Sequence, residues 1–510
     1  MHSLSRRDFS RVFAASAPAS SVWASQSPQA RRPNILFILA DDLGYGDVGF
    51  LNPESKIPTP NLDRLAKQGM RFTDAHSPSA VCTPTRYGLL TGRYCWRTRL
   101  QRGVLSSFGE TLIEPGRLTV PSFLKSHGYD TAAVGKWHLG WNWPTTDGVP
   151  PVFKDAKWNV DFSRPATDGP TTRGFDYYFG TDVPNYPPFC FIENDHTVGK
   201  PTDTLPVEKY QNEKNPAFGA LELRPGPMLR GWDFVEILPA LTRRAVEYIN
   251  KRDKSKPFFL YLPLTGPHTP VTPAPEFRGT TKVGPYGDFV RQVDWSVGQV
   301  LQALDRGGHT GNTLVIFTSD NGPERYCYEH ARISGHYSMA PWRGVKRDLW
   351  EGGHRVPFVA RWPGQIKPGT ASGELTTHCD LLATIAAVLD VPLPGNAGED
   401  SYNMLPALLG RKRSAPLRPS AVLHSWHGNF AVREGDWVLI DHPTGDNNVE
   451  PEWFQKKQGY RPHAFAGELY SLRQDPAQRN NLYSSRPEIV RRLKELLETC
   501  KREGRSPRSA

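Results

Sequence analysis

The sequence predicts an α/β protein whose large domain is built on a mainly parallel sheet and is followed by a smaller α+β domain. Through residues 33–394, short apolar runs alternate with segments of helical periodicity, which is the pattern of successive β-α-β units. From residue 395 onward, the pattern changes to hairpin-like strands and a closing helix. We therefore expect two folded parts, at 33–394 and 395–510, after an N-terminal segment at 1–32.

Apolar runs of strand length mark the predicted sheet. Most are rich in β-branched or aromatic residues and are bounded by Gly, Pro or polar residues. They are NILFILA at 34–40, TAAVG at 131–135, PFFLYLPL at 257–264, TLVIFTS at 313–319 and VPFVARW at 356–362.

Helical patterns lie between these runs, and the segment 141–235, rich in Pro, Gly, Trp and Asp, predicts long loops over the sheet. The predicted helices are NLDRLAKQG at 61–69, VPSFLKSHG at 120–128, RRAVEYINKR at 243–252, DFVRQVDWSVGQVLQALDRGG at 288–308 and DLLATIAAVLD at 380–390. The C-terminal part should contain a hairpin at 431–440, a strand and turn at 468–482 and a helix at 487–502.

Composition narrows the function classes. The 510 residues have a net charge of +10, but no Lys/Arg-rich run and no nucleic-acid-binding signature, so an acidic small substrate fits better than nucleic acid. No apolar segment reaches the roughly 18 residues that a membrane span needs. The six cysteines are too few and too scattered for a disulfide framework, although one or two bridges stay possible.

The N-terminal segment contains the pair Arg6-Arg7, an Ala/Ser-rich stretch and a possible cleavage site near Ala24. It resembles a twin-arginine export signal, which implies the twin-arginine machinery as a partner and a periplasmic or secreted location. The alternative is a disordered basic tail.

The stretch VCTPTRYGLLTG at 81–92 predicts a short helix with a cysteine at its start. Pro84 suits the first turn of a helix and Gly92 suits its end. Cys82 then lies at a helix N-terminus, where free backbone N–H groups favour an anion, and Arg86 lies one turn further along the same face. We expect an anion to bind there.

Acidic side chains follow two of the predicted strands, in the pairs Asp41-Asp42 and Asp320-Asn321. Ligands of an open parallel sheet bind at the carboxyl ends of its strands. Adjacent carboxylates repel without a cation, and a set of oxygen ligands suits calcium or magnesium rather than zinc. Either pair alone is more simply a turn or a helix cap, but two pairs at strand ends predict a metal site.

Basic side chains follow strands as well. Lys136 and His138 come after one strand, His268 follows another, and Lys346 precedes a third. Each alone is unremarkable, because most lysines and histidines are solvated or structural. Together with Arg86 at one edge of the sheet, they would form a pocket for a tetrahedral oxyanion.

These motifs resemble those of the formylglycine-dependent type I sulfatases, within the alkaline phosphatase superfamily. CTPTRYGLLTG matches the signature C-x-P-x-R, and GYDTAAVGKWH at 128–138 is similar to the second family signature. NILFILADDLGYGD, TSDNG, GVKRDLWEGGHRVP and ELYSLRQDP follow in family order, so the resemblance covers residues 33 to 485. It implies a large mixed, mainly parallel sheet sandwiched by helices.

The resemblance implies that Cys82 is oxidised to formylglycine by a formylglycine-generating or sulfatase-maturating enzyme. One hydroxyl of the hydrated aldehyde would attack the sulfate sulfur and displace the alcohol, and the other would then expel sulfate. One calcium ion per chain would be held by the metal ligands Asp41, Asp42, Cys82, Asp320 and Asn321.

The resemblance also assigns roles to the basic residues. Arg86 would hold the formylglycine hydroxyl, and Lys136 would contact sulfate. His138 would orient the diol and take its proton. His268 and Lys346 would flank the leaving oxygen, and either one could donate its proton as general acid.

The substrate is expected to be a sulfated carbohydrate, because the chain looks most like relatives of arylsulfatase A and of N-acetylgalactosamine-6-sulfatase. We favour 6-O-sulfated galactose or N-acetylgalactosamine units of a polysaccharide. Aromatic and basic loop residues are candidates for binding the sugar, although ordinary loop packing is the simpler interpretation of each: Tyr186, His196, Arg325, His330 and His336.

Two other functions fit the sequence. A phosphonate or phosphate monoester hydrolase of the same superfamily could use the same nucleophile and metal. If Cys82 is never oxidised, the protein would be a non-enzymatic anion-binding protein.

Overall fold

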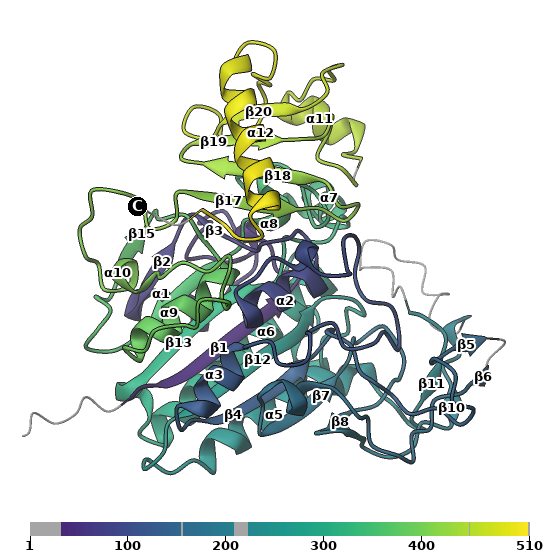
Figure 1. The fold of residues 1–510 in the computed structure, drawn as a ribbon. Helices are drawn as coiled ribbons and strands as arrows, with labels where there is room; N and C mark the ends of the chain where they lie inside the picture. The colour runs from purple at the N-terminus through teal and green to yellow at the C-terminus, as the bar shows by residue number, and fades with distance from the viewer. Residues whose placement is uncertain (1–31, 155–156, 209–222, 448, 508–510) are drawn as a thin grey trace, which may run out of the picture. The chain divides into compact units, whose positions relative to one another are not determined.

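The computed structural model describes residues 32–154, 157–208, 223–447 and 449–507, and residues 33–510 form one compact unit. Among the described residues, ten strands form a central sheet in the order β15-β2-β14-β13-β1-β12-β4-β7-β8-β9 (Figure 1). The predicted export signal lies outside the described residues.

The centre of the sheet is parallel and its flanks are mixed. β13, β1, β12, β4 and β7 pair in parallel, whereas β14 is antiparallel to both β13 and β2. The strands are β1 (Asn34–Asp41), β2 (Met70–Phe72), β4 (Asp130–Lys136), β7 (Tyr177–Thr181), β8 (Ile192–Glu193), β9 (His196–Thr197), β12 (Phe258–Pro267), β13 (Thr313–Ser319), β14 (Phe358–Arg361) and β15 (Thr370–Ser372). The predicted mainly parallel α/β fold is confirmed.

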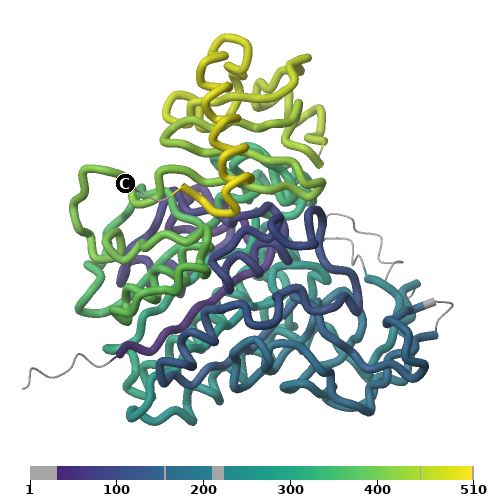
Figure 2. Tube along the Cα trace, viewed as in Figure 1, coloured from purple at the N-terminus to yellow at the C-terminus, as the bar shows by residue number. Residues whose placement is uncertain are grey.

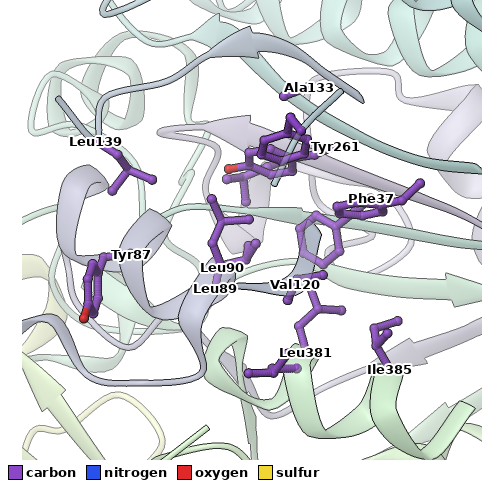
Figure 3. Close-up of a cluster of buried hydrophobic side chains, with 14 of the residues drawn as sticks. Phe37, Tyr87, Leu89, Leu90, Val120, Ala133, Leu139, Tyr261, Leu381 and Ile385 are labelled. Atoms are coloured by element: carbon purple, nitrogen blue, oxygen red, sulfur yellow. The ribbon is translucent and has the colours of Figure 1, made fainter. Parts of the chain in front are cut away.

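Helices cover both faces of this sheet because its central strands are apolar on both sides. Alternate residues of β1 enter different cores: Phe37 packs with α2, α3 and α9, as Figure 3 shows, whereas Ile38 packs with α1, α5 and α6. The helices are α1 (Pro60–Gln68), α2 (Cys82–Thr91), α3 (Val120–Ser126), α5 (Ile237–Asn250), α6 (Pro285–Arg306), α7 (Cys327–Ser334), α8 (Glu351–His354), α9 (Leu381–Val388) and α10 (Leu405–Leu408).

The prediction of loops throughout 141–235 is wrong at one important place. The segment Tyr177–Thr181 forms β7, which pairs with β4 inside the central sheet. Its aromatic run is too short to stand out from the surrounding loops, and pairing with β4 supports it. The other strands of the loop regions are two-residue pairs: β3 (Ala75–His76) with β16 (Thr376–Thr377), β5 (Phe153–Lys154) with β6 (Lys157–Trp158), and β10 (Asp203–Thr204) with β11 (Pro227–Met228).

The C-terminal part contains a four-stranded antiparallel sheet in the order β17-β18-β19-β20. Its elements are β17 (Ser420–His424), β18 (Phe430–Glu434), β19 (Trp437–Ile440), β20 (Glu468–Ser471), α11 (Glu452–Gln458) and α12 (Pro487–Arg502). Leu493 and Leu497 of α12 pack on one face of this sheet, and Leu349 and Trp350 pack on the other. In the Cα trace, α12 is the yellow helix beside the yellow-green strands of this sheet (Figure 2). The predicted boundary after residue 394 stays a prediction.

No helix in the described part of the chain has the length and hydropathy required to cross a bilayer.

Candidate active site

Four neighbouring parallel strands bring the predicted site residues to one edge of the central sheet. Asp41 is the last residue of β1 and Lys136 is the last residue of β4. His268 directly follows β12, and Asp320 directly follows β13. All four side chains are buried. The carboxyl ends of these strands therefore form the floor of a polar site, as expected for an open parallel sheet.

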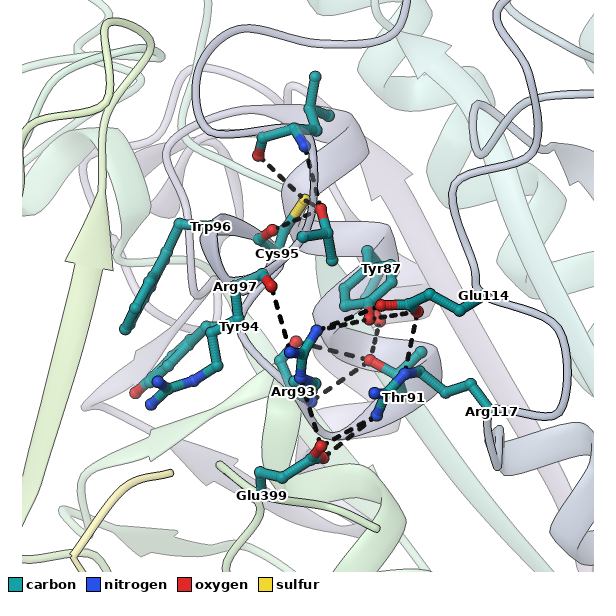
Figure 4. A network of polar contacts seen from close by, with 12 residues as sticks. Tyr87, Thr91, Arg93, Tyr94, Cys95, Trp96, Arg97, Glu114, Arg117 and Glu399 are labelled. Atoms are coloured by element: carbon teal, nitrogen blue, oxygen red, sulfur yellow. Dashed lines mark hydrogen bonds and ion pairs between the residues drawn. The ribbon is translucent and has the colours of Figure 1, made fainter. Parts of the chain in front are cut away.

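Helix α2 delivers the cysteine to this edge. It begins at Cys82 and ends at Thr91, and Gly92 caps it with a φ of 67° that suits a residue without a Cβ. Beyond its C-terminus, Arg93 binds Glu114 at 3.3 Å and Glu399 at 3.3 Å (Figure 4). This network fixes the end of α2 that lies away from the site.

Each carboxylate of the site is paired with a cation. Lys136 Nζ lies 2.7 Å from Asp41 Oδ2, and Lys346 Nζ lies 2.7 Å from Asp42 Oδ2. Arg86 donates from Nη2 to Asp320 Oδ2 at 2.8 Å. Arg86 therefore contacts the Asp320 carboxylate directly rather than standing free to bind an anion alone.

Two oxygens at the centre of this group have no partner. Among the residues that the structure describes, Asp41 Oδ1 and Asn321 Oδ1 are buried without a hydrogen-bond partner, while Asn321 Nδ2 donates to Asp42 Oδ1 at 2.7 Å. Ligand atoms of Asp41, Asp42, Cys82 and His268 lie within 4.8 Å of one another. A buried acceptor without a partner costs about 1–3 kcal/mol. A cation that prefers oxygen ligands would bind both free oxygens, so the residues fit calcium.

Electrostatics at Asp320 reflect the crowding of carboxylates at this edge of the sheet. Burial and the neighbouring charge of Asp41 raise the pKa of the Asp320 carboxyl, although Arg86 opposes the rise. Carboxylates this close to one another compete for the charged state, and a bound cation would remove that competition.

Cys82 is a poor nucleophile as a thiol. Its side chain is 3% exposed, and burial raises the pKa of the thiol to about 11 despite the opposing charges of Lys136 and Lys346. A thiol with such a pKa is almost entirely protonated at neutral pH and reacts slowly. The position has the charges needed to bind an anion, but the unmodified side chain lacks the reactivity.

The two histidines present free nitrogens to the site. His138 Nε2 donates to the Leu105 carbonyl at 3.2 Å, which leaves the buried Nδ1 without a partner. His268 Nδ1 donates to the Thr269 carbonyl at 2.6 Å, and its Nε2 faces Asp42 Oδ2 at 3.8 Å. Burial lowers the pKa of both imidazoles, with Lys136 adding to the effect, so both are neutral near pH 7.

Backbone conformation also marks the site. Asp42 and His138 have φ angles of 64° and 52°, in the left-handed region that residues with a Cβ rarely adopt. Such strain costs about 1–3 kcal/mol and persists where surrounding contacts enforce it. At His138 the enforcing contact is its N–H bond to Asp182 Oδ1 at 3.1 Å.

Two buried acids near the site were not predicted from the sequence. Asp182 follows β7, and burial raises its pKa to about 6. Glu324 binds Arg347 at 2.6 Å and lies 3.8 Å from Lys346. Asp182 was missed because β7 was missed. Glu324 comes shortly after the predicted Asp320-Asn321 pair in the sequence. This closeness was the signal that could have identified it as a residue near the site.

The loop residues proposed for sugar binding differ in their burial and in their distance from the site. Tyr186 is half-buried and packs edge-on against His138, with ring centroids 5.9 Å apart. The prediction is wrong for His330 and His336, which are buried: His330 packs on Tyr286, and His336 binds Asp47 at 2.7 Å. For Arg325 and His196 it stays a prediction; the His196 side chain is exposed and bound to its neighbour Asp195.

Comparisons with known proteins agree with this geometry. Residues 33–391 match the sulfatase family model. The chain is 35% identical to an N-acetylgalactosamine-6-O-sulfatase of Bacteroides thetaiotaomicron, covering 92% of this chain and 94% of that one. It is 34% identical to human arylsulfatase A, covering 92% and 87% of the two chains.

A solved structure from work on the metabolism of glycosaminoglycans by Bacteroides thetaiotaomicron superposes with a TM-score of 0.77 at 33% identity, covering 92% of this chain and all of that chain. The chain therefore belongs to the sulfatase family and is a sulfuric ester hydrolase.

Proposed function

We propose that this sulfatase removes O-sulfate, preferentially from the 6-position, from galactose or N-acetylgalactosamine units of sulfated polysaccharides. The observation that supports it most is the site itself, in which a buried helix N-terminus at Cys82 is surrounded by three cationic side chains and two unpartnered oxygens. The preference for the sugar and the 6-position follows from the 35% identity to an N-acetylgalactosamine-6-O-sulfatase.

Calcium would be held by the four oxygen-bearing side chains at the ends of β1 and β13, together with the modified Cys82. When bound, it would polarise a sulfate oxygen and favour ionisation of the attacking hydroxyl. The free oxygens of Asp41 and Asn321 support this assignment, which also includes Asp42 and Asp320.

The nucleophile would be formylglycine, made from Cys82 by a maturation enzyme. The raised pKa of the thiol supports this, because the unmodified side chain has almost no thiolate at neutral pH. The hydrated aldehyde would supply an oxygen nucleophile at the same place.

The surrounding side chains have separate roles in binding the sulfate and in transferring protons. Arg86 holds the nucleophile and neutralises Asp320, and Lys136 binds the sulfate. His138 accepts a proton at its unpartnered Nδ1, which the Leu105 carbonyl keeps free by binding Nε2. His268 and Lys346 flank Asp42, and one of them, Lys346 in its charged form or His268 once it is protonated, donates the proton to the leaving oxygen.

The export signal and a periplasmic or secreted location are part of the proposal. They rest on the Arg6-Arg7 pair and the Ala/Ser-rich stretch that follows it. Fractionation of the native host, with Arg6 and Arg7 both replaced by lysine as the control, tests this: the parent should be found outside the cytoplasm and the variant inside.

Sulfate release from matched sugars tests the substrate. We expect a higher kcat/KM for N-acetylgalactosamine 6-sulfate and galactose 6-sulfate than for the 4-sulfates of the same sugars. Equal or higher values for the 4-sulfates would contradict the 6-position. An aryl phosphonate hydrolysed faster than the matching aryl sulfate would favour the phosphonate hydrolase instead.

A further inference from the structure

An arginine lies beside Tyr186, a loop aromatic whose ring contacts His138. Arg224 lies over the ring of Tyr186, with its guanidinium carbon 3.6 Å from the ring centroid. Its Nη2 donates to the Tyr186 hydroxyl at 2.7 Å, and its backbone N–H donates to the Asn185 carbonyl at 3.1 Å. Stacking, a side-chain bond and a backbone bond therefore fix the orientation of this guanidinium.

Tyr186 connects this arginine to the reaction centre. The edge of its ring contacts His138, while its face contacts Arg224. Arg224 consequently lies one aromatic ring away from His138, outside the buried pocket but next to it.

Arg224 differs from the cations of the pocket in its pairing and exposure. Arg86, Lys136 and Lys346 are buried and bound to carboxylates. Arg224 is half-exposed, and in the described part of the chain no carboxylate lies within ion-pair distance of it. Within the described part of the chain, the Tyr186 hydroxyl accepts from one of its five N–H donors, so the planar fork of the guanidinium keeps donors for an external anion.

We propose that Arg224, positioned by Tyr186, binds a second anionic group of the substrate, a carboxylate or a further sulfate ester on the same glycan chain. The proposal rests on the proposed function, because it takes the substrate to be a sulfated sugar. It deepens that function by selecting polyanionic chains over glycans whose only charge is the sulfate to be removed. A guanidinium suits this role because it binds carboxylate or sulfate through two parallel hydrogen bonds.

The test compares Arg224→Gln with the matched control Arg230→Gln. Arg230 belongs to the same segment, is exposed, and binds Asp203 only at the surface. Three substrates contain the same 6-O-sulfated N-acetylgalactosamine: a neutral disaccharide, a disaccharide with a uronic acid, and a disaccharide with a second sulfate. A charged hydrogen bond is worth about 1.5–3 kcal/mol, so Arg224→Gln should lower kcat/KM about tenfold to a hundredfold more for a two-anion substrate than for the neutral one.

The same experiment distinguishes a carboxylate from a second sulfate ester as the group that Arg224 binds. A selective loss with the uronic acid disaccharide identifies a carboxylate, and a selective loss with the disulfated one identifies a sulfate ester. Arg224→Lys should recover part of the loss, because it restores the charge without the fork. Arg230→Gln should change kcat/KM by the same factor for all three substrates. Equal losses by Arg224→Gln on all three substrates, or none on any, would overturn the proposal.

A binding measurement keeps this result separate from the proposed function. Calorimetry with Cys82→Ala protein measures affinity for the same disaccharides without turnover. Adding Arg224→Gln should weaken binding of at least one two-anion ligand about tenfold or more relative to the neutral one. If the parent enzyme hydrolyses aryl sulfates but none of these sugars, the proposed substrate fails. Cys82→Ala protein that binds neither two-anion disaccharide more tightly than the neutral one would overturn the role of Arg224.

Discussion

Two buried clusters of this sulfatase contain the same kinds of side chain and differ in how completely those side chains are paired. Both combine carboxylates, basic side chains and histidines, and in both the possible ligand atoms lie close enough to hold a metal ion. One is the candidate active site. The other, which we name the arginine-bridged cluster, consists of Asp74, His76, Glu351, His354, Arg355 and Arg433.

Every carboxylate oxygen and imidazole nitrogen of the arginine-bridged cluster has a partner. Arg355 binds Asp74 at 3.0 Å and Glu351 at 2.8 Å, and Arg433 binds the same two acids at 3.1 and 3.2 Å. The two histidines of the cluster face each other at 3.0 Å between their Nδ1 atoms. Two carboxylates and two guanidiniums balance in charge, so a divalent cation would add two uncompensated charges.

The polar atoms of the active site are not all paired in this way. Asp41 Oδ1, Asn321 Oδ1 and His138 Nδ1 are all buried without a partner in the described ranges of the chain. Side-chain composition would mark either cluster as a metal site, but only one retains acceptors for a ligand. We therefore expect chemistry and metal dependence in the active site, and stability alone from the arginine-bridged cluster.

The largest effect on activity should come from Cys82→Ala. A helix N-terminus tolerates alanine, whereas the chemistry needs an oxygen nucleophile, so we expect kcat/KM for an aryl sulfate to fall by several orders of magnitude. Cys190→Ala is the control, because Cys190 is buried away from these charges. Turnover above a tenth of the parent rate in Cys82→Ala would place the nucleophile elsewhere.

Removal of the proposed metal should have the next largest effect on activity. Chelation should inactivate the enzyme, and calcium should restore it, because the free oxygens of Asp41 and Asn321 need a cation. Asp320→Asn should raise the calcium concentration needed for half-maximal activity. Glu351→Gln should leave that concentration unchanged. Active protein that contains stoichiometric zinc, and neither calcium nor magnesium, would contradict the ligand assignment.

The leaving-group side should give a substrate-dependent effect. Nitrophenol leaves without protonation and a sugar alkoxide does not, so loss of the general acid should harm sugar sulfates more. We expect His268→Ala or Lys346→Ala to differ by at least about tenfold between the two substrate types, about 1.4 kcal/mol in barrier. Lys136→Ala should slow both substrates. Equal losses for both the His268 and Lys346 variants would mean that neither protonates the leaving oxygen.

The smallest effect on activity, and a large one on stability, should come from Glu351→Gln. Breaking a buried ion pair costs about 3–5 kcal/mol, so the free energy of unfolding should fall while kcat of the folded enzyme stays close to the parent value. Calorimetric unfolding and activity at a temperature below the transition measure the two effects. Loss of kcat without loss of stability would give this cluster a role in the reaction.

The pH dependence of stability provides a second test of the cluster. Burial raises the pKa of Glu351, but Arg433, His76 and Arg355 outweigh it and lower the pKa from 4.5 to about 2. A lowered carboxylate pKa stabilises the fold above the unfolded value, and the contribution is lost as pH falls from 4.5 toward 2. Glu351→Gln should flatten the decline of the unfolding free energy in that range. An unchanged slope would contradict the pairing.

The sequence predicted which motif side chains lie close together, because the topology of the sheet determines their positions. Once the apolar runs are assigned to parallel strands, the polar residues after Ala40 and Ser319 must meet at one edge of the sheet. Helix α2 was similarly fixed by Pro84 and Gly92. These predictions depend on local patterns and on one rule of sheet topology.

Other features depended on contacts that no local pattern contains. Asp182 was missed with β7, whose pairing with β4 is a tertiary effect. The bridge between Arg433 and Glu351 joins residues 82 positions apart. His330 and His336 were proposed to bind sugar because loop polarity does not reveal burial, and both pack inside the protein.

The central claim is that the reactive group of this enzyme is a modified Cys82, and the mass of the peptide that contains it tests this most directly. Conversion of the thiol to the aldehyde lowers the peptide mass by about 18 Da, and hydration restores about the same mass, so labelling with a hydrazide distinguishes the hydrated aldehyde from the thiol. In active protein, we predict the hydrazide label at Cys82 in proportion to activity. Fully active protein in which Cys82 alkylates as a free thiol and takes no hydrazide would contradict the account.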